Sequence, residues 1–504
     1  MSSEARSRNA PDGWKLAWML LLASSVVYFF WTNEADNDLW GHLLFGRDIL
    51  ASRTIPRLDT YAYTTIGQPW VNHEWLSQVL MAAVYDWAGS AGLLVSKFAI
   101  TTTTFLLLLA HVRRHTQSPH VRGVIGLLAI AVLARGFGIR PQVFTYFFVA
   151  LTLLLLDEYG RGRRSVLWLL PGMFLIWVNL HGGFVLGLGI VGLFAGADLL
   201  GGKGRSLRPW IVFIASAAVT SLNPYGPRLL FYIWNELSRA HPISEWQPAS
   251  MEAAQFAFFV MLGLFFATLV FMRDWRRDGW QAALALGVGF LALRHQRHTP
   301  VFALCAAAPL AMQVDSAVRW LGQRSTFALS PAARRLIGAA IVLLAALQFA
   351  LTGIRGWSSG FQITFNAFEY PVAAVQALRD AGAGGNIAVP LDWGEYVLWF
   401  LAPQVRVSLD GRFATVFPER VVEDNFNFFS GAPGWRRLLD QYPTQAVLVP
   451  AGWPCPIRTL ADWQLAYRDR SAEVYVRSNG GEGLRLKAMP IEPPALRLPL
   501  GIFP

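Results

Sequence analysis

The chain has 504 residues, of which 54% are hydrophobic and only 15% are charged. Soluble domains carry about 25% charged residues, so this composition excludes a wholly soluble protein. The net charge of +11 could suit a nucleic-acid partner, but most basic residues lie in short loops between apolar runs, and membrane topology explains them there. We therefore expect no nucleic acid. Two cysteines, Cys305 and Cys455, cannot define a disulfide framework.

Eleven apolar runs predict helices that cross a membrane, because about 20 apolar residues span the hydrocarbon core. The first run follows Arg6, Arg8 and Lys15, as a signal peptide would, but no small-residue cleavage site comes after it. We interpret it as the first span. The expected spans are 14–31, 91–112, 121–134, 141–156, 165–178, 184–200, 209–221, 254–272, 279–293, 300–313 and 336–353.

Alternate loops between these spans are basic, and they predict the orientation of the chain. The positive-inside rule assigns such loops, and with them the N-terminus, to the cytoplasm. An odd number of spans then places the segment after residue 353 outside. The sequence thus predicts a multi-pass protein of the bacterial inner membrane, with a transmembrane domain at 1–356 and a periplasmic or extracellular domain at 357–504. The basic loop residues are Arg113, Arg114 and Arg122; Arg161, Arg163 and Arg164; Lys203, Arg205 and Arg208; Arg273, Arg276 and Arg277; and Arg319, Arg324, Arg334 and Arg335.

The first external loop, 32–90, begins with two carboxylates, Asp36 and Asp38, on the non-cytoplasmic side. Apolar residues at helical spacing predict an amphipathic helix over 39–51 that lies along the membrane interface. A second amphipathic helix is expected to run to Trp87. The two carboxylates could bind Mg²⁺ or Mn²⁺, act as a general base or only solvate a helix end. The length of the loop and its aromatic residues weigh against the last interpretation.

Three motifs follow one another in this loop: D-x-D-x-W-x-H, P-x-x-D-x-[FY]-[SA]-Y-T and P-W-x-x-x-E-W-L. With the acidic pair directly after the first span, the chain resembles the GT-C membrane glycosyltransferases. These include protein O-mannosyltransferases and the enzymes that attach aminoarabinose to lipid A. The motifs are similar to those of a bacterial branch of that group over the whole chain. The matching residues are Asp36, Asp38, Trp40 and His42; Pro56, Asp59, Tyr61, Ala62, Tyr63 and Thr64; and Pro69, Trp70, Glu74, Trp75 and Leu76.

The resemblance implies that a sugar is transferred, with inversion, from a polyprenyl-phosphate donor to an exoplasmic acceptor, which could be a lipid, a glycan or a protein. It also implies that Asp36 or Asp38 serves as the base or organises a metal ion. Negative charge develops on the leaving phosphate, so cationic and hydrogen-bonding groups are expected to bind it. The candidates for binding substrate and phosphate are His42, His73, Glu74, Arg135, Arg140, His181, Tyr225, Arg294, His295, Arg297 and His298.

The cluster Arg294 to His298 is the strongest of these candidates, because basic residues in an external turn depart from the positive-inside rule. Simpler interpretations stay open for it and for the others. The cluster could bind lipid headgroups without catalysis, and Arg140 could reach toward headgroups. His181 could cap a helix end, and Tyr225 lies in a Pro- and Gly-rich turn.

The segment from residue 357 onward has soluble composition and predicts a small α/β domain. Asp410 and Arg412 follow an expected strand, at the kind of strand end where α/β sheets form binding sites. They could bind the acceptor or could pair with each other. The expected elements are a helix at 371–381, a strand at 386–390, a helix from 392, strands at 405–409 and 446–450, and a hairpin at 463–476.

Two other functions compete with sugar transfer. A transporter or flippase of a lipid-linked envelope precursor would place ionisable residues near the middle of the membrane and often shows internal repeats. Here the ionisable residues stand at span ends, and the sequence shows no repeat. The other alternative is a non-catalytic scaffold for envelope assembly, with the C-terminal domain as its binding module.

Overall fold

The computed structural model describes residues 13–200, 206–237, 244–272, 274–324, 330–359, 361–478 and 501–503. The chain forms two compact units, which are described separately. The membrane unit consists of Met1–Thr32 and Leu94–Phe361, and the sheet unit consists of Asn33–Leu93 and Gln362–Pro504. The first external loop therefore belongs to the same compact unit as the C-terminal segment. The domain boundary at 356/357 stays a sequence-based prediction.

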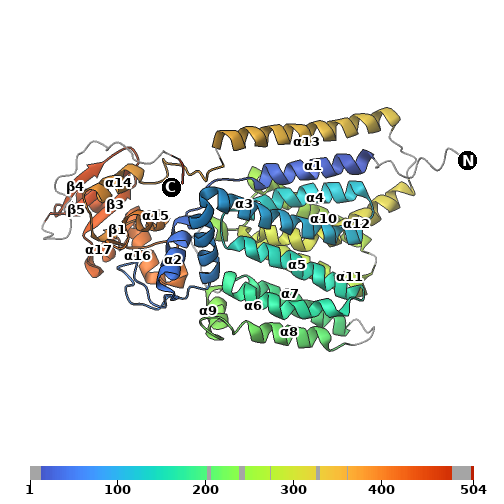
Figure 1. Ribbon diagram of the computed structural model, residues 1–504, viewed down its shortest axis with the longest axis horizontal. Coiled ribbons are helices and arrows are strands. Elements are labelled where there is room, and N and C mark those ends of the chain that lie inside the picture. The colour runs from blue at the N-terminus through green and yellow to red at the C-terminus, as the bar shows by residue number, and fades with distance from the viewer. Residues whose placement is uncertain are drawn as a thin grey trace, which may run out of the picture. The chain divides into compact units, whose positions relative to one another are not determined.

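The membrane unit is a bundle of helices, as Figure 1 shows. Among the described helices, seven are long and apolar enough to cross a membrane, and three further apolar helices are shorter. Each of the eleven predicted spans falls on a helix, which confirms the polytopic helical fold class. The helices that contribute to this unit are α1 (Gly13–Phe30), α3 (Trp75–His115, from Leu94 on), α4 (Pro119–Leu133), α5 (Gln142–Gly160), α6 (Leu169–Leu180), α7 (Phe184–Leu200), α8 (Arg208–Val219), α9 (Arg228–Leu237), α10 (Phe256–Thr268), α11 (Trp275–Arg294), α12 (Thr299–Gly322) and α13 (Pro331–Ser359).

Helix α12 forms the core of the bundle, where it packs against α4, α5, α10 and α11. Its residues from Thr299 to Ala311 are all buried, as expected for a helix that is apolar on every side. Helix α3 combines two predicted elements, the second amphipathic helix and the second span. It is continuous except at Gly89, whose φ of 59° and ψ of −154° are not helical. Glycine adopts a positive φ without the strain that a side chain would add.

The sheet unit contains a mixed five-stranded sheet in the order β2-β1-β3-β5-β4. Strand β1 pairs in parallel with β2 and β3, whereas β3, β5 and β4 pair antiparallel. The C-terminal α/β elements predicted from the sequence are therefore confirmed. The elements of this unit are α2 (Leu39–Ser52), the first part of α3, α14 (Val372–Asp380), β1 (Gly385–Ala388), α15 (Leu391–Leu401), β2 (Val405–Val407), α16 (Glu419–Ser430), α17 (Arg437–Gln441), β3 (Ala446–Pro450), β4 (Trp463–Arg468) and β5 (Ala472–Arg477).

The first external loop extends this sheet at the edge formed by β2. Ala62 bridges Val407 in parallel. The Tyr63 N–H donates to the Val407 carbonyl at 3.0 Å, and the Val407 N–H donates to the Tyr61 carbonyl at 3.1 Å. The loop motif that contains Asp59 is thereby fixed beside the segment that follows β2, which carries Asp410 and Arg412.

Candidate functional site

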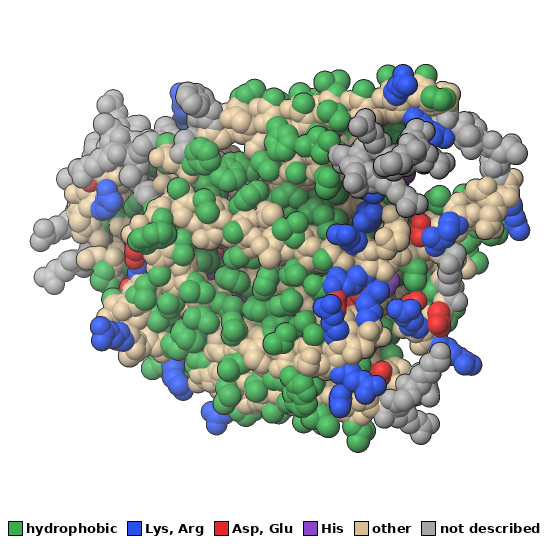
Figure 2. All heavy atoms as spheres, turned by 45° about the vertical axis from the view of Figure 1, so that its right-hand side comes forward, with side chains coloured by type: hydrophobic (Ala, Val, Ile, Leu, Met, Phe, Trp, Pro, Cys, Tyr) green, Lys and Arg blue, Asp and Glu red, His purple; other side chains and the backbone are tan. Residues whose placement is uncertain are grey.

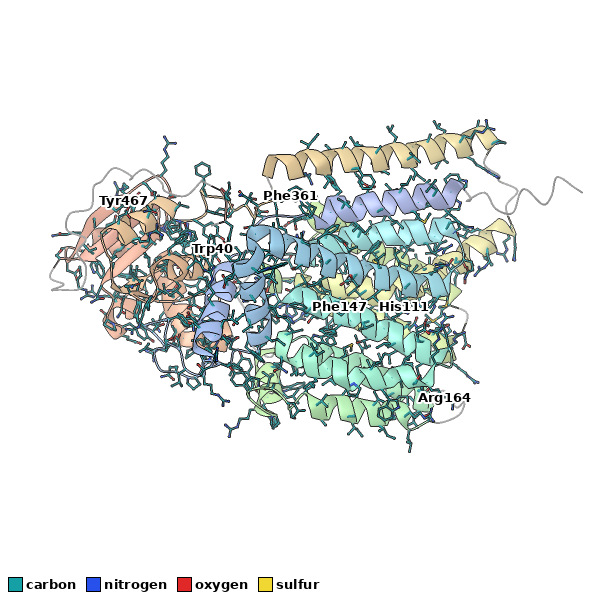
Figure 3. The ribbon with its side chains drawn as sticks, in the orientation of Figure 1. Trp40, His111, Phe147, Arg164, Phe361 and Tyr467 are labelled. Carbon is teal, nitrogen blue, oxygen red and sulfur yellow. The ribbon has the colours of Figure 1, made fainter. Side chains whose placement is uncertain are left out.

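Helix α2 positions the two carboxylates of the first loop. Its residue Trp40 is fully buried, where its ring stacks on Phe503 at 4.2 Å and meets Tyr396 edge-on at 4.8 Å. Figure 3 shows Trp40 among the side chains of the sheet unit. The Asp38 N–H donates to Asp36 Oδ1 at 3.1 Å, so the Asp36 carboxylate closes the turn that precedes α2. Asp38 is the N-cap residue of α2, but its side chain forms no capping hydrogen bond.

Asp38 lines a hollow in the sheet unit, which we call the acidic hollow. Its volume is about 400 Å³, including the space that is open to solvent. Five of the candidate site residues from the sequence analysis line it, whereas Glu395 was not among those candidates. The lining residues are Asp38, His42, Phe45, Trp70, Val71, Asn72, His73, Glu74, Gln78, Glu395, Gly411, Arg412 and Thr415.

The carboxylates of Asp38 and Glu395 both approach Gly411 at the place where a side chain would begin. A Cβ atom placed on Gly411 would lie 2.6 Å from Asp38 Oδ1 and 2.8 Å from Glu395 Oε1. No side chain other than glycine's hydrogen fits there without moving an acid. Glu395 is itself buried, and its Oε2 accepts the N–H of Gly41 at 3.0 Å. The α2 backbone therefore holds Glu395 beside Asp38.

Burial raises the pKa of Glu395 well above its usual value, and the nearby charges of Asp38 and Asp410 raise it further. The Gly41 N–H and the Arg412 guanidinium act in the opposite direction. Burial and the charge of Asp38 also raise the pKa of Asp392. A raised pKa favours the protonated form of the Glu395 carboxyl group.

The raised pKa of Glu395 predicts a pH dependence of stability. A carboxyl whose pKa is higher in the folded state binds more protons there than when unfolded, so stability falls as pH rises through the raised value. The slope from one such group is at most about 1.4 kcal/mol per pH unit. In Glu395→Gln the side chain is neutral, and its amide oxygen can still accept the Gly41 N–H. We expect thermal unfolding scans at increasing pH to show a smaller loss of stability for this variant than for the wild type. Parallel curves for the two proteins would contradict the assignment.

Arg412 is the centre of a buried ion cluster that borders the acidic hollow. Its Nε and Nη2 donate to the two oxygens of Asp410 at 2.8 and 2.7 Å, and its Nη1 donates to Asp59 at 2.6 Å. The three side chains are at most 3% exposed. The guanidinium also lies 4.8 Å from the ring centroid of Trp70 and 5.0 Å from that of Tyr61. Of the two interpretations of Asp410 and Arg412, the structure shows the pairing directly, and acceptor binding stays a prediction.

The basic candidates of the membrane unit gather around one glutamate, Glu245. It contacts Arg140 at 3.0 Å and Arg297 at 3.2 Å. His295 Nδ1 lies 2.7 Å from the carbonyl oxygen of the next residue, Trp246, and the Arg297 guanidinium lies 4.5 Å from the Trp246 ring centroid.

The same group of turns includes Arg135, whose Nη2 donates to Gln296 Oε1 at 3.5 Å. Arg294 is exposed in the last turn of α11, and His298 is the N-cap residue of α12. The turns at 134–140, 244–247 and 294–298 are therefore neighbours, as they must be if they bind one anionic group. One glutamate partly compensates their positive charge.

His181 and Tyr225 have local structural roles that explain their positions. His181 ends α6, and its Nδ1 accepts the Gly183 N–H at 2.9 Å. Because that nitrogen is an acceptor, the hydroxyl of Thr145, 2.8 Å away, donates to it. The Tyr225 N–H donates to Asn223 Oδ1 at 2.8 Å within a turn. Substrate binding by either side chain stays a prediction.

Loss of Glu245 is expected to destabilise the chain modestly. In Glu245→Ala the guanidinium groups of Arg140 and Arg297 lose their shared counter-ion, and partly exposed ion pairs contribute roughly 0.2–1 kcal/mol each. A thermal unfolding scan should show a decrease of a few degrees. The control is Glu252→Ala, a change at an exposed glutamate of the same loop. Equal melting temperatures for Glu245→Ala and the control would show that the cluster does not depend on Glu245.

The fold of the chain is similar to solved structures of ArnT from Cupriavidus metallidurans. The structure described as bound to undecaprenyl phosphate is 14% identical and has a TM-score of 0.54, over 92% of this chain and 98% of that one. The apo structure of the same protein is 13% identical and has a TM-score of 0.51, over 91% and 97%. This likeness confirms the GT-C-type fold predicted from the sequence. No family model matches the chain, and no curated protein matches it.

Sequence reasoning missed two members of the site. Glu395 lies in the helix expected from residue 392, and the sequence alone assigns it no role. Asp59 was predicted as a motif residue only. An isolated acid three residues after a proline in a polar loop carries no sign that it pairs with Arg412, which lies 353 positions later.

Proposed function

We propose that the chain is a membrane glycosyltransferase that transfers a sugar from a polyprenyl-phosphate donor to an acceptor hydroxyl on the non-cytoplasmic side of the bacterial inner membrane. The observation that carries the proposal is the acidic hollow, where Asp38 stands beside the buried Glu395. The fold supports it, since the similar ArnT structure is described as bound to undecaprenyl phosphate. Fold alone does not specify function, so the argument depends on the residues.

We assign the general base to Asp38. In the reaction, the acceptor oxygen forms a bond to the anomeric carbon while the bond from that carbon to the phosphate oxygen breaks. The phosphate leaves with the bonding electrons, and a carboxylate takes the acceptor proton. Asp38 lines the hollow, whereas the Asp36 carboxylate accepts the N–H of Asp38. Asp36 is therefore a positioning residue in this assignment.

Glu395 holds a proton in this mechanism. Because burial and the neighbouring acids raise the pKa of Glu395, we assign Glu395 as the protonated neighbour and Asp38 as the base. A Mg²⁺ or Mn²⁺ ion held by Asp36 and Asp38 is the alternative suggested by the sequence, and carboxylate oxygens suit either ion. Removal of metal ions by a chelator distinguishes the proton-sharing mechanism from the metal-dependent one. The proton-sharing mechanism predicts that EDTA leaves sugar transfer unchanged, and loss of transfer that added Mg²⁺ or Mn²⁺ restores would support the metal.

Separately from the acidic hollow, we propose that the basic turns of the membrane unit bind a polyprenyl phosphate, with Arg135, Arg140 and Arg297 as the cationic groups. Guanidinium groups suit phosphate because they donate paired hydrogen bonds in a fixed geometry. If these residues bind the donor, Arg297→Ala raises the KM for donor and leaves the KM for acceptor unchanged.

The proposal is tested by supplying the purified full-length protein with a panel of polyprenyl-phosphate-linked hexoses and pentoses and following the loss of each donor. We expect one donor to be consumed by the wild type and to persist with Asp38→Asn. If both Asp36→Asn and Asp38→Asn consume the donor as fast as the wild type, the acidic hollow does not take part in the reaction.

A further inference from the structure

Two histidines and an aspartate meet at the end of the membrane unit that carries its basic loops. His111 and His115 are four residues apart near the end of α3, so their imidazoles lie on one face of that helix. Asp157 belongs to the last turn of α5. One ligand atom from each of the three side chains lies within 4.8 Å of the other two. Figure 3 labels His111 near this end of α3, and Figure 2 shows Lys and Arg side chains gathered at the same end of the molecule.

The imidazoles are buried, and one of their nitrogens lacks a hydrogen bond. His111 is 3% exposed, and the side chain of His115 is 5% exposed. In the described part of the chain, His111 Nε2 has no hydrogen-bond partner, whereas His115 Nε2 contacts only Asp157 Oδ1, at 3.3 Å. A buried polar atom left in this state destabilises a fold by about 1–3 kcal/mol, so it calls for a ligand.

The two oxygens of Asp157 face different groups. Oδ2 accepts from Arg161 Nε at 2.9 Å and lies 3.6 Å from Arg114 Nε. Oδ1 lies 3.3 Å from His115 Nε2, on the side of the imidazoles. The arginines thus hold the carboxylate in place through one oxygen and leave the other directed at the histidines. This is the arrangement in which outer hydrogen bonds orient a metal ligand.

The charges around the cluster are of both signs. Arg114 and Arg163 pair with the carboxylate of Glu158, and Asp278, buried close to His115 and Asp157, pairs with Arg277 at 3.6 Å. Three acids, Asp157, Glu158 and Asp278, therefore face four arginines, Arg114, Arg161, Arg163 and Arg277. Binding of a divalent ion would depend on its bonds to the imidazoles and the carboxylate, since the surrounding charges supply no excess of acid.

We propose that His111, His115 and Asp157 bind one divalent first-row transition-metal ion, of which zinc fits best. Two nitrogen ligands and one carboxylate suit zinc, whereas Mg²⁺ and Ca²⁺ prefer oxygen ligands alone. Zinc bonds of roughly 2.0–2.1 Å require the three ligand atoms to approach one another further, which side-chain rotation can achieve. The ion would join α3 to α5 and leave one coordination position for water. This site is separate from the acidic hollow, and it does not depend on the proposed reaction.

The test is metal binding by the full-length protein, purified without a polyhistidine tag and stripped with a chelator. Cobalt(II) replaces zinc and gives visible absorption bands whose intensity reports four-coordinate binding. We expect one equivalent of cobalt in the wild type and in the control His120→Gln, which changes a histidine at the start of the neighbouring helix α4. His111→Gln and Asp157→Asn should weaken binding by more than roughly 100-fold, since even outer-ligand changes weaken it by 10–100-fold.

A folded wild type that shows no such bands, or one that binds no more cobalt than His111→Gln, overturns the proposal. The wild-type spectrum decides this by itself, even if a variant fails to fold. A second readout uses stability, because a ligand that binds only the folded state raises the unfolding temperature. Zinc should raise it for the wild type and for His120→Gln, and should leave it unchanged for His111→Gln. An equal rise in all three proteins would place the ion elsewhere.

Discussion

Asp38→Asn is expected to lower the kcat of sugar transfer by about 10²–10⁴-fold, the usual contribution of a general base. The amide is nearly the same size as the carboxylate but cannot take the acceptor proton. Because the amide keeps the size and shape of the carboxylate, the replacement should leave the fold and the KM values nearly unchanged. Steady-state kinetics with the donor identified in the panel would measure both quantities.

Asp36→Asn is the matched control for this experiment. Its amide oxygen can still accept the Asp38 N–H, so the turn before α2 is kept. We expect this variant to keep most of its activity. The assignment of roles would be reversed if Asp36→Asn lost transfer in a folded protein while Asp38→Asn kept it.

Arg412→Ala should have the largest effect on stability, a decrease of about 3–5 kcal/mol in the free energy of unfolding. The change removes the single cation between Asp59 and Asp410, and both carboxylates are fully buried. Arg412→Lys should recover only part of the loss, because an ammonium group cannot form the paired contact with Asp410. Thermal unfolding and the yield of folded protein would show the effect.

A surface arginine of the same unit provides the control for Arg412. Arg436 pairs with Asp440 at 3.2 Å, with both side chains more than half exposed. Exposed pairs of this kind contribute little, so Arg436→Ala should change stability by less than about 1 kcal/mol. Equal effects of Arg412→Ala and Arg436→Ala would mean that the buried cluster does not hold the sheet unit together.

Local patterns in the sequence were sufficient to predict most elements of the fold. Apolar runs located the helices of the membrane unit except α9, which lies between the spans predicted at 209–221 and 254–272. Alternation of helices and short strands located β1 to β5. These signals are local, because hydrophobic periodicity needs only neighbouring residues. The GT-C-type fold was accessible only through the resemblance of the first-loop motifs.

The pairing of distant residues could not be predicted in the same way. The neighbours of Asp38 in the acidic hollow come from positions more than 350 residues later, Glu395 and Arg412. Tertiary packing of α2 against α15 brings Glu395 to this place, with the Gly41 N–H as its hydrogen-bond donor. The spacing of His111 and His115 was visible in the sequence, but Asp157, which makes it a three-ligand cluster, comes from another helix.

One measurement tests the central claim most directly. A donor is labelled with one isotope in its sugar and another in its phosphate, and is incubated with the full-length protein in liposomes that contain acceptor. The measurement then follows where each label goes. A glycosyltransferase separates the two labels, because the sugar moves to the acceptor and the phosphate stays on the polyprenyl chain. We predict that separation with the wild type and its loss with Asp38→Asn. If the two labels crossed the bilayer together and stayed joined, the chain would be a flippase, and its assignment as a glycosyltransferase would be contradicted.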